Sequence, residues 1–213
     1  MREFTGIPLV VDLDHTLIDT DLLHQSSKGV LKKSPWLIIK FPFWLMKGKG
    51  YLKEQLVKRF DINVTALPYN QTTIDYIKQR KQEGNLIVLA TASHKRYAFK
   101  VAEYLKTEKT KGKHKTSKNH ELFATAPQTT QINTGSSLFD DVMASNASFN
   151  LSSQNKADKL IERFGKGGFD YIGDHRRDLP VWEASNMAIL VNVSKRTIRK
   201  TKHLKVLTLS TKN

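Results

Sequence analysis

The sequence predicts an α/β fold: a doubly wound parallel sheet with a small helical cap inserted after the first strand. Two observations predict the sheet. Short apolar runs, typical of strands buried on both faces, recur along the chain. Segments with helical spacing of their apolar residues separate these runs. A third observation, a long helical segment directly after the first run, predicts the cap.

The expected strands and helices alternate along the chain. The apolar runs predict strands at residues 7–11, 86–90, 169–172 and 187–193. Helical spacing predicts helices at residues 72–83, 98–105 and 156–164. This alternation is typical of βα units, in which helices cover both faces of a parallel sheet.

Two segments exceed what a minimal α/β domain needs. Residues 20–68 look helical and contain several bulky side chains, so we predict that they form the cap. Residues 1–19 and 69–213 then form the core. Residues 106–137 are rich in lysine and then in Gln, Thr and Asn. Such a composition buries too little apolar surface to order itself, so we expect a flexible surface insert there.

The composition combines a globular apolar fraction with strong positive charge. Of 213 residues, 39% are hydrophobic, which is enough for a packed core. The 35 Lys and Arg against 20 Asp and Glu give a net charge of +15. This charge favours phosphorylated substrates, an anionic membrane or nucleic acid as partners. Cysteine is absent from the sequence, which excludes disulfide scaffolds, zinc–thiolate sites, iron–sulfur clusters and cysteine nucleophiles in it.

The most apolar stretch, residues 36–46, is shorter than the roughly 20 residues that cross a bilayer. Lys40 and Pro42 also interrupt it. The first residues lack the long apolar stretch of a secretory signal. We therefore expect neither a signal peptide nor a transmembrane helix, and a cytoplasmic protein that meets membranes only peripherally.

Two aspartates directly follow the first predicted strand. Asp12 and Asp14 are two residues apart, so an extended chain would place both side chains on one face. Ligands of open α/β sheets bind beyond the carboxyl ends of the strands. Paired carboxylates at such a place favour a hard divalent cation, Mg²⁺ above all. The alternative interpretation is a strand-ending turn with solvated acids, in which Thr16 caps a helix.

The ends of later elements add groups that suit a phosphate and a cation. Thr91 and Ser93 end the second predicted strand where a helix starts, a position suited to phosphate. Ser93 is equally explained as an N-cap. Asp174 ends the third predicted strand, and Asp178 follows four residues later. Lys156 begins a predicted helix and, taken alone, is most simply a solvated surface lysine.

In their order along the chain, these residues resemble the four motifs of the haloacid dehalogenase (HAD) superfamily. The motifs are Asp12-x-Asp14-x-Thr16, Thr91, Lys156 and Gly173-Asp174-x-x-x-Asp178. The wider sequence is most similar to the HAD domain fused to UbiA-type prenyltransferases, through stretches such as residues 67–70, 89–93 and 169–174. The resemblance covers residues 8–193 apart from the insert. It departs from the pattern at His15, where glycine is commoner, and at Ser152-Ser153, where this branch usually has Lys-Gly.

The resemblance implies a HAD/Rossmannoid core that acts as a magnesium-dependent phosphomonoester phosphatase. It assigns Asp12 as the nucleophile, which forms an aspartyl-phosphate. Asp14 would be the general acid and base. It also implies that Asp12, Asp174 and Asp14, the last through its backbone carbonyl, hold the Mg²⁺ cofactor.

The same resemblance assigns the groups around the phosphate. Thr91 and Lys156 would bind the phosphoryl oxygens. Thr16 and Asp178 would support the site, Asp178 by orienting the metal shell or Lys156.

Basic and aromatic residues are mixed in the cap. Residues 28–59 hold nine Lys and Arg residues and a single acid, Glu54. The aromatic residues among them are Trp36, Phe41, Phe43, Trp44 and Tyr51. We favour the simpler interpretation, in which the aromatic residues pack the cap onto the core and the lysines are solvated. The alternative is a surface for an anionic membrane or a phosphorylated macromolecule.

A second basic run, residues 195–205, is interpreted as a solvated helix or tail. No nucleic-acid-binding motif accompanies it, so we do not expect nucleic acid as a partner. Two functions then remain open. We favour a phosphatase whose substrate is a phosphorylated protein, phosphotyrosine included, or a small metabolite. The alternative is a catalytically vestigial HAD fold that acts as a basic membrane- or partner-binding module.

Overall fold

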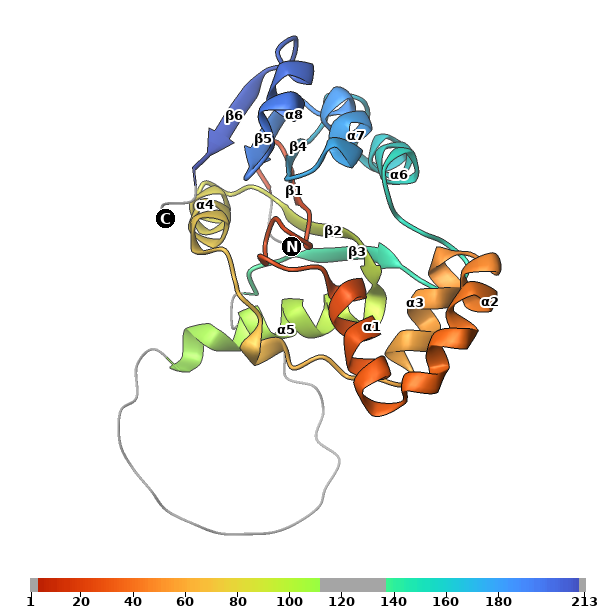
Figure 1. Ribbon diagram of the computed structural model, residues 1–213. Coiled ribbons are helices and arrows are strands. Elements are labelled where there is room, and N and C mark those ends of the chain that lie inside the picture. The colour runs from red at the N-terminus through yellow and green to blue at the C-terminus, as the bar shows by residue number, and fades with distance from the viewer. Residues whose placement is uncertain (1–3, 112–136, 211–213) are drawn as a thin grey trace, which may run out of the picture.

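The computed structural model describes residues 4–111 and 137–210, which contain a six-stranded parallel sheet (Figure 1). The strand order is β3-β2-β1-β4-β5-β6, and each neighbouring pair is parallel. The strands are β1 (Leu9–Val11), β2 (Ile87–His94), β3 (Asp141–Ser145), β4 (Asp170–Gly173), β5 (Met187–Val191) and β6 (Val206–Leu209). The predicted α/β class and parallel sheet are therefore confirmed.

The four predicted strands correspond to β1, β2, β4 and β5, whereas the edge strands β3 and β6 were not predicted. The side chains of β3 are mostly half-buried, and those of β6 alternate between exposed and half-buried. Neither strand is covered on both faces, so neither has a continuous apolar run. Part of the basic run 195–205 forms a short helix, α8 (Lys195–Lys200), before the chain enters β6.

Helices cover both faces of the sheet (Figure 1). They are α4 (Gln71–Gln82) and α5 (Lys95–Lys111) on one face, and α6 (Gln154–Phe164) and α7 (Leu179–Ala184) on the other. Alternate side chains of β1 point to opposite faces. Leu9 and Val11 join the core under α4 and α5, and Val10 joins the core under α6 and α7. The central strand is thus fully buried, which explains its continuous apolar sequence.

A helical segment is inserted between β1 and α4. It contains α1 (Leu22–Lys33), the 3₁₀ helix η1 (Pro35–Lys40), α2 (Phe41–Met46), α3 (Lys49–Val57) and the 3₁₀ helix η2 (Val64–Ala66). Its helices pack on a small core of their own, formed by Val30, Leu37, Trp44 and Leu56. We call the segment from α1 to α3 the cap; the boundary of 20–68 as a separate domain stays a prediction.

Helix α5 continues to Lys111, into the segment 106–137 that was expected to be a flexible insert. Residues 112–136 of that segment lie outside the described residues. Within residues 4–111 and 137–210, no helix is both long enough and apolar enough to cross a membrane.

Candidate active site

The site lies at the carboxyl ends of the central strands, where parallel strands of an open sheet bind ligands. Val11, the last residue of β1, is aligned with Leu89 of β2 and with Ile172 of β4. Asp12 continues this register, because its backbone N–H donates to the carbonyl oxygen of Ile172 at 3.0 Å. Asp174, which directly follows β4, therefore lies beside Asp12.

Three carboxylates form an acidic cluster at this edge. One oxygen each of Asp12, Asp174 and Asp178 lie within 4.8 Å of one another. Burial, and then the charges of Asp178 and Asp12, raise the pKa of Asp174 to about 8. Burial and the charge of Asp12 also raise the pKa of Asp178. Crowded carboxylate oxygens, two of them from groups with raised pKa values, are the donor set that a hard divalent cation such as Mg²⁺ neutralises.

This cluster overlaps the predicted metal set only in part. Asp12 and Asp174 were predicted as metal ligands, and the structure brings them together. Asp178, predicted to support the site, is the third member of the cluster. The carboxylate of Asp14 is not in the cluster, and the role of its backbone carbonyl as a metal ligand stays a prediction.

Lys156 is buried against the nucleophile candidate. Its Nζ lies 3.0 Å from Asp12 Oδ1 and donates to the phenol oxygen of Tyr171 at 2.7 Å. The Tyr171 hydroxyl in turn donates to Asp178 Oδ1 at 3.0 Å. Lys156 is only 2% exposed, so the solvated interpretation of this lysine is wrong. The helix α6 begins two residues before it and directs the lysine into the site.

Tyr171 is a site residue that sequence reasoning missed. It lies within β4, in an apolar run, and was therefore counted only as part of a strand. Its hydroxyl joins Lys156 to Asp178, and burial raises its pKa well above the ordinary value, so it stays protonated and can donate. A tyrosine two residues before the Gly173-Asp174 pair is the signal that was available.

Asp14 is held apart from the acidic cluster by two donors. The Leu22 N–H donates to Oδ1 at 2.9 Å, and the Ser93 hydroxyl donates to Oδ2 at 2.6 Å. Burial nevertheless raises the pKa of Asp14 to about 7, and the charge of Asp12 adds to this effect. A carboxyl with a pKa near neutrality can both give and accept a proton.

The two threonines of the predicted site are fully buried. Thr16 donates its hydroxyl to Asp174 Oδ1 at 3.3 Å and so contacts the acidic cluster. The hydroxyl oxygen of Thr91 accepts the N–H of Ser93 at 2.9 Å. Ser93, two residues later, is the hydroxyl that reaches Asp14 and lines the pocket. Thr91 thus bonds to the backbone of Ser93 near the end of β2, and Ser93 is the residue that lines the pocket.

A pocket of about 600 Å³ opens over these groups, between the cap and the strand ends. The core side of the pocket is lined by the acidic cluster together with Asp14 and Lys156, and the other side is lined by cap residues. Among the cap residues is Lys53 of α3, whose Nζ donates to the Ala92 carbonyl at 2.5 Å and to Asn150 Oδ1 at 2.7 Å. Burial lowers the pKa of Lys53 to about 8.

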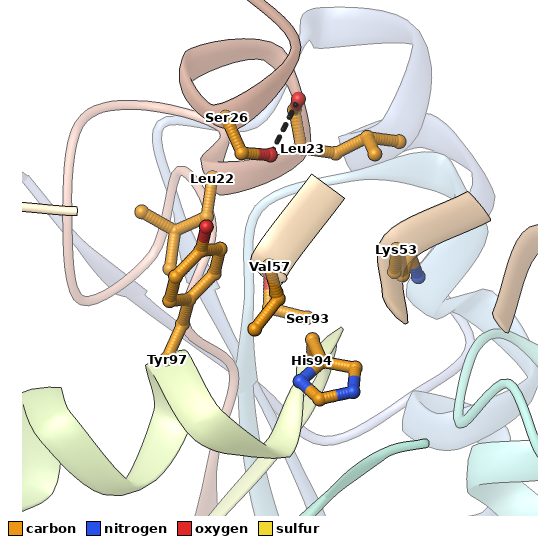
Figure 2. A pocket seen from close by; sticks show the side chains of 8 residues that line it. All are labelled: Leu22, Leu23, Ser26, Lys53, Val57, Ser93, His94 and Tyr97. Carbon is orange, nitrogen blue, oxygen red and sulfur yellow. Dashed lines mark hydrogen bonds between the residues drawn. The ribbon is translucent and has the colours of Figure 1, made fainter. Parts of the chain in front are cut away.

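Helix α3 joins the cap to the core at three neighbouring positions. Besides Lys53, Glu54 bonds with His94 Nε2 at 2.7 Å. Gly50 lies so close to the loop after β3 that a Cβ would be 2.5 Å from the carbonyl oxygen of Asn146. Figure 2 shows a small cavity between the cap and the core, lined by Lys53 and Val57 of the cap and by Ser93 and His94 of the core, among others. The cap is therefore closely docked on the core.

Two non-glycine residues at the site have left-handed backbone conformations. His15 has φ 58° and Ser153 has φ 49°. These are the positions at which the sequence departs from the glycines of the resembled motifs. Both positions thus have the backbone conformation that glycine adopts most easily. Because His15 and Ser153 carry side chains, this conformation is strained there.

Comparisons with known proteins agree with this geometry. The profile of the NLI interacting factor-like phosphatase family matches residues 7–175. The uncharacterized protein y4nM of Sinorhizobium fredii (strain NBRC 101917 / NGR234) is 32% identical over 186 residues, which are 87% of this chain and 30% of that protein. The chain thus spans less than a third of the length of this relative.

Solved structures share the fold at low identity. A predicted phosphatase from Clostridium acetobutylicum has a TM-score of 0.59 at 13% identity, covering 96% of this chain and 94% of the other. A phospho-aspartyl intermediate analogue of phosphoserine phosphatase has a TM-score of 0.53 at 13% identity, covering 94% of this chain and 91% of the other. The family profile matches residues 7–175, which are most of this chain, so the chain belongs to the NLI interacting factor-like phosphatase family.

Proposed function

We propose that the protein is a magnesium-dependent phosphomonoester phosphatase that forms an aspartyl-phosphate on Asp12. The observation that carries this proposal is the separation of two kinds of carboxylate. Asp12 lies among Lys156, Asp174 and Asp178 and is suited to a charged nucleophile. Asp14 lies apart, with a pKa of about 7, and is suited to proton transfer.

In the first step, Asp12 attacks the phosphorus of the substrate. Its Oδ1 is engaged by the Leu13 N–H at 2.8 Å and by Lys156, so we assign the attack to Oδ2. A bond forms between this oxygen and phosphorus while the bond from phosphorus to the leaving oxygen breaks. Asp14, in its protonated form, gives its proton to that leaving oxygen.

In the second step, water cleaves the aspartyl-phosphate. Asp14, now a carboxylate, accepts a proton from the water, whose oxygen bonds to phosphorus as the bond to Asp12 breaks. Inorganic phosphate leaves, and both aspartates return to their starting states. Lys156 stays beside the phosphoryl oxygens throughout and offsets their charge.

Asp12, Asp174 and the Asp14 carbonyl would hold the Mg²⁺, and Asp178 lies close enough to ligate or orient it. When bound, Mg²⁺ neutralises charge on the phosphoryl oxygens. The Thr16 hydroxyl positions Asp174 for this purpose, and the Thr91 hydroxyl supports Ser93 at the phosphate side of the pocket.

The substrate class follows less directly from the site. The pocket of about 600 Å³ has room for more than a phosphate group, and a cap lysine, Lys53, lies on its wall. A phosphorylated protein segment, phosphotyrosine included, or a small phosphorylated metabolite fits these features. A panel of phosphopeptides assayed beside a panel of phosphorylated metabolites separates the two.

The test of the chemistry is an aryl-phosphate assay with and without Mg²⁺. We expect magnesium-dependent turnover that Asp12→Asn lowers by at least about a thousandfold, because the nucleophile is removed. Asp158→Asn, a change at an exposed acid on α6, serves as the control and should leave turnover unchanged. Equal turnover by Asp12→Asn and the wild type would overturn the mechanism. Lack of turnover by the wild type on any phosphoester would favour the vestigial binding module instead.

We also retain the resemblance to the HAD domain fused to UbiA-type prenyltransferases as part of this proposal. It rests on the sequence stretches around the same strand ends, residues 89–93 and 169–174. A cytoplasmic location is proposed with it and is tested by fractionating cells that express the tagged chain.

A further inference from the structure

The outer side of the cap carries a group of exposed apolar side chains. They belong to η1 and α2, and we call them the cap patch: Trp36, Ile38, Ile39, Phe43 and Met46. Met46 is 85% exposed, Ile39 69% and Phe43 63%. A cluster of large apolar residues this exposed is uncommon on a soluble protein surface and marks a contact site.

The exposure of the cap patch follows from the way its two helices are anchored. Leu37 and Trp44, in the same two helices, are buried in the small core of the cap. These two anchors fix the orientation of η1 and α2 and turn the remaining apolar residues outward. The simpler interpretation of the aromatic residues therefore holds for Trp44, which is buried, but not for Trp36 and Phe43, which are mostly exposed.

The charged residues near the cap patch in the sequence are lysines. From residue 22 to residue 53 the chain has seven lysines and no aspartate or glutamate. Lys40 Nζ lies 4.8 Å from the centre of the Trp36 ring, and Lys47 Nζ lies 5.2 Å from that of Tyr51. Apolar side chains, one of them a tryptophan, rimmed by lysines are the composition of a surface that enters the headgroup region of an anionic bilayer.

We propose that the cap patch binds the surface of a membrane that contains anionic lipid. The apolar residues enter the boundary between headgroups and acyl chains, and the lysines contact lipid phosphates and carboxylates. A second copy of the chain is a poorer occupant, because two such surfaces face to face would bring lysines against lysines. The proposal concerns binding alone and does not depend on the phosphatase activity.

Co-sedimentation of the full chain with vesicles tests the proposal. We expect binding to phosphatidylcholine vesicles that contain phosphatidylserine and much weaker binding to pure phosphatidylcholine. The double change Ile39→Ser and Phe43→Ser should lower the partition coefficient by at least about tenfold, since each buried side chain contributes about a factor of ten. Lys40→Gln with Lys47→Gln should lower the preference for anionic vesicles by about tenfold or more.

The matched control is Phe99→Ser. Phe99, on α5, is 55% exposed, similar to Phe43, but lies outside the cap. This variant should bind vesicles as the wild type does. The circular dichroism spectrum and the urea midpoint of the Ile39/Phe43 variant should match those of the wild type, which shows that the cap is still folded. Leu45 is left unchanged because it lines the pocket.

Three results would overturn the proposal. The first is the same binding to neutral and anionic vesicles, or no binding to either. The second is an equal loss of binding in Phe99→Ser and in the Ile39/Phe43 variant. The third is a wild-type dimer that becomes a monomer when Ile39 and Phe43 are replaced, since the patch would then be covered by a second copy.

Discussion

The buried amine of Lys53 allows a quantitative prediction about stability and pH. Lys53 is 8% exposed and packs between Ala92 and Asn150, to which it donates hydrogen bonds. Burial lowers its pKa from 10.5 to about 8, against the opposing effect of the charges of Asp14 and Asp21. The perturbation is Lys53→Met, which leaves an unbranched side chain one atom shorter and removes the charge.

The expected magnitude follows from the pKa difference. Because the pKa in the folded protein is below that in the unfolded chain, the charged amine destabilises the fold at pH values below about 8. This penalty disappears as the pH rises from about 8 to 10.5, where the folded protein loses the proton before the unfolded chain does. The pKa difference corresponds to about 3 kcal/mol in the free energy of unfolding.

The assay is urea unfolding between neutral pH and pH 10.5. The free energy of unfolding of the wild type should rise by about 3 kcal/mol relative to that of Lys53→Met over this range. The variant also loses the hydrogen bonds of Lys53. This loss changes its free energy of unfolding by a constant amount near neutral pH and does not make it depend on pH. Lys47→Met, at an exposed position two residues before the same helix, should follow the wild type. Parallel curves for the wild type and Lys53→Met would refute the reasoning.

Three further changes test other parts of the site. Tyr171→Phe removes the donor to Asp178 and one acceptor of Lys156. We expect the free energy of unfolding, measured in urea, to fall by about 1–3 kcal/mol. An unchanged free energy of unfolding would show that these two hydrogen bonds contribute nothing to stability. At exposed His15, with φ 58°, His15→Val should cost about 1–2 kcal/mol while His15→Gly stays within about 1 kcal/mol of the wild type, measured by thermal unfolding. Equal effects of Val and Gly would contradict the strain at this position. Mg²⁺ at about a hundred times its dissociation constant should stabilise the wild type by about 2.7 kcal/mol, and Asp174→Asn should reduce this gain sharply; a gain that survives Asp174→Asn would place the ion elsewhere.

The central sheet could be predicted from the sequence because its strands are covered on both faces. Val10 and its neighbours in β1 are fully buried, and such strands read as unbroken apolar runs. The edge strands could not be predicted in this way. β3 begins with Asp141 and ends with Ser145, and Thr208 interrupts the apolar residues of β6, so neither strand has an unbroken apolar run.

The site was predictable where it depends on strand ends and less so where it depends on loops. Asp12 and Asp174 directly follow neighbouring strands, so the fold class alone places them together. Asp14 is turned toward Leu22 and Ser93 by the path of the chain into the cap, which no spacing rule gives. Asp178 joins the acidic cluster because a 3₁₀ helix, η3 (Arg176–Asp178), turns the chain back toward Asp12 and Asp174.

The close approach of Gly50 to the core limits which residues can stand at that position in evolution, whereas the exposed positions of the cap have no such limit. At position 50 the restriction is one of space, because even alanine would push α3 away from the carbonyl oxygens of Asn146 and Ala147. The outward positions 38, 39, 43 and 46 meet no such obstacle. Selection for folding alone would keep the glycine and let those four positions drift to polar residues. An apolar surface that persisted there through generations would reflect selection by something outside the chain.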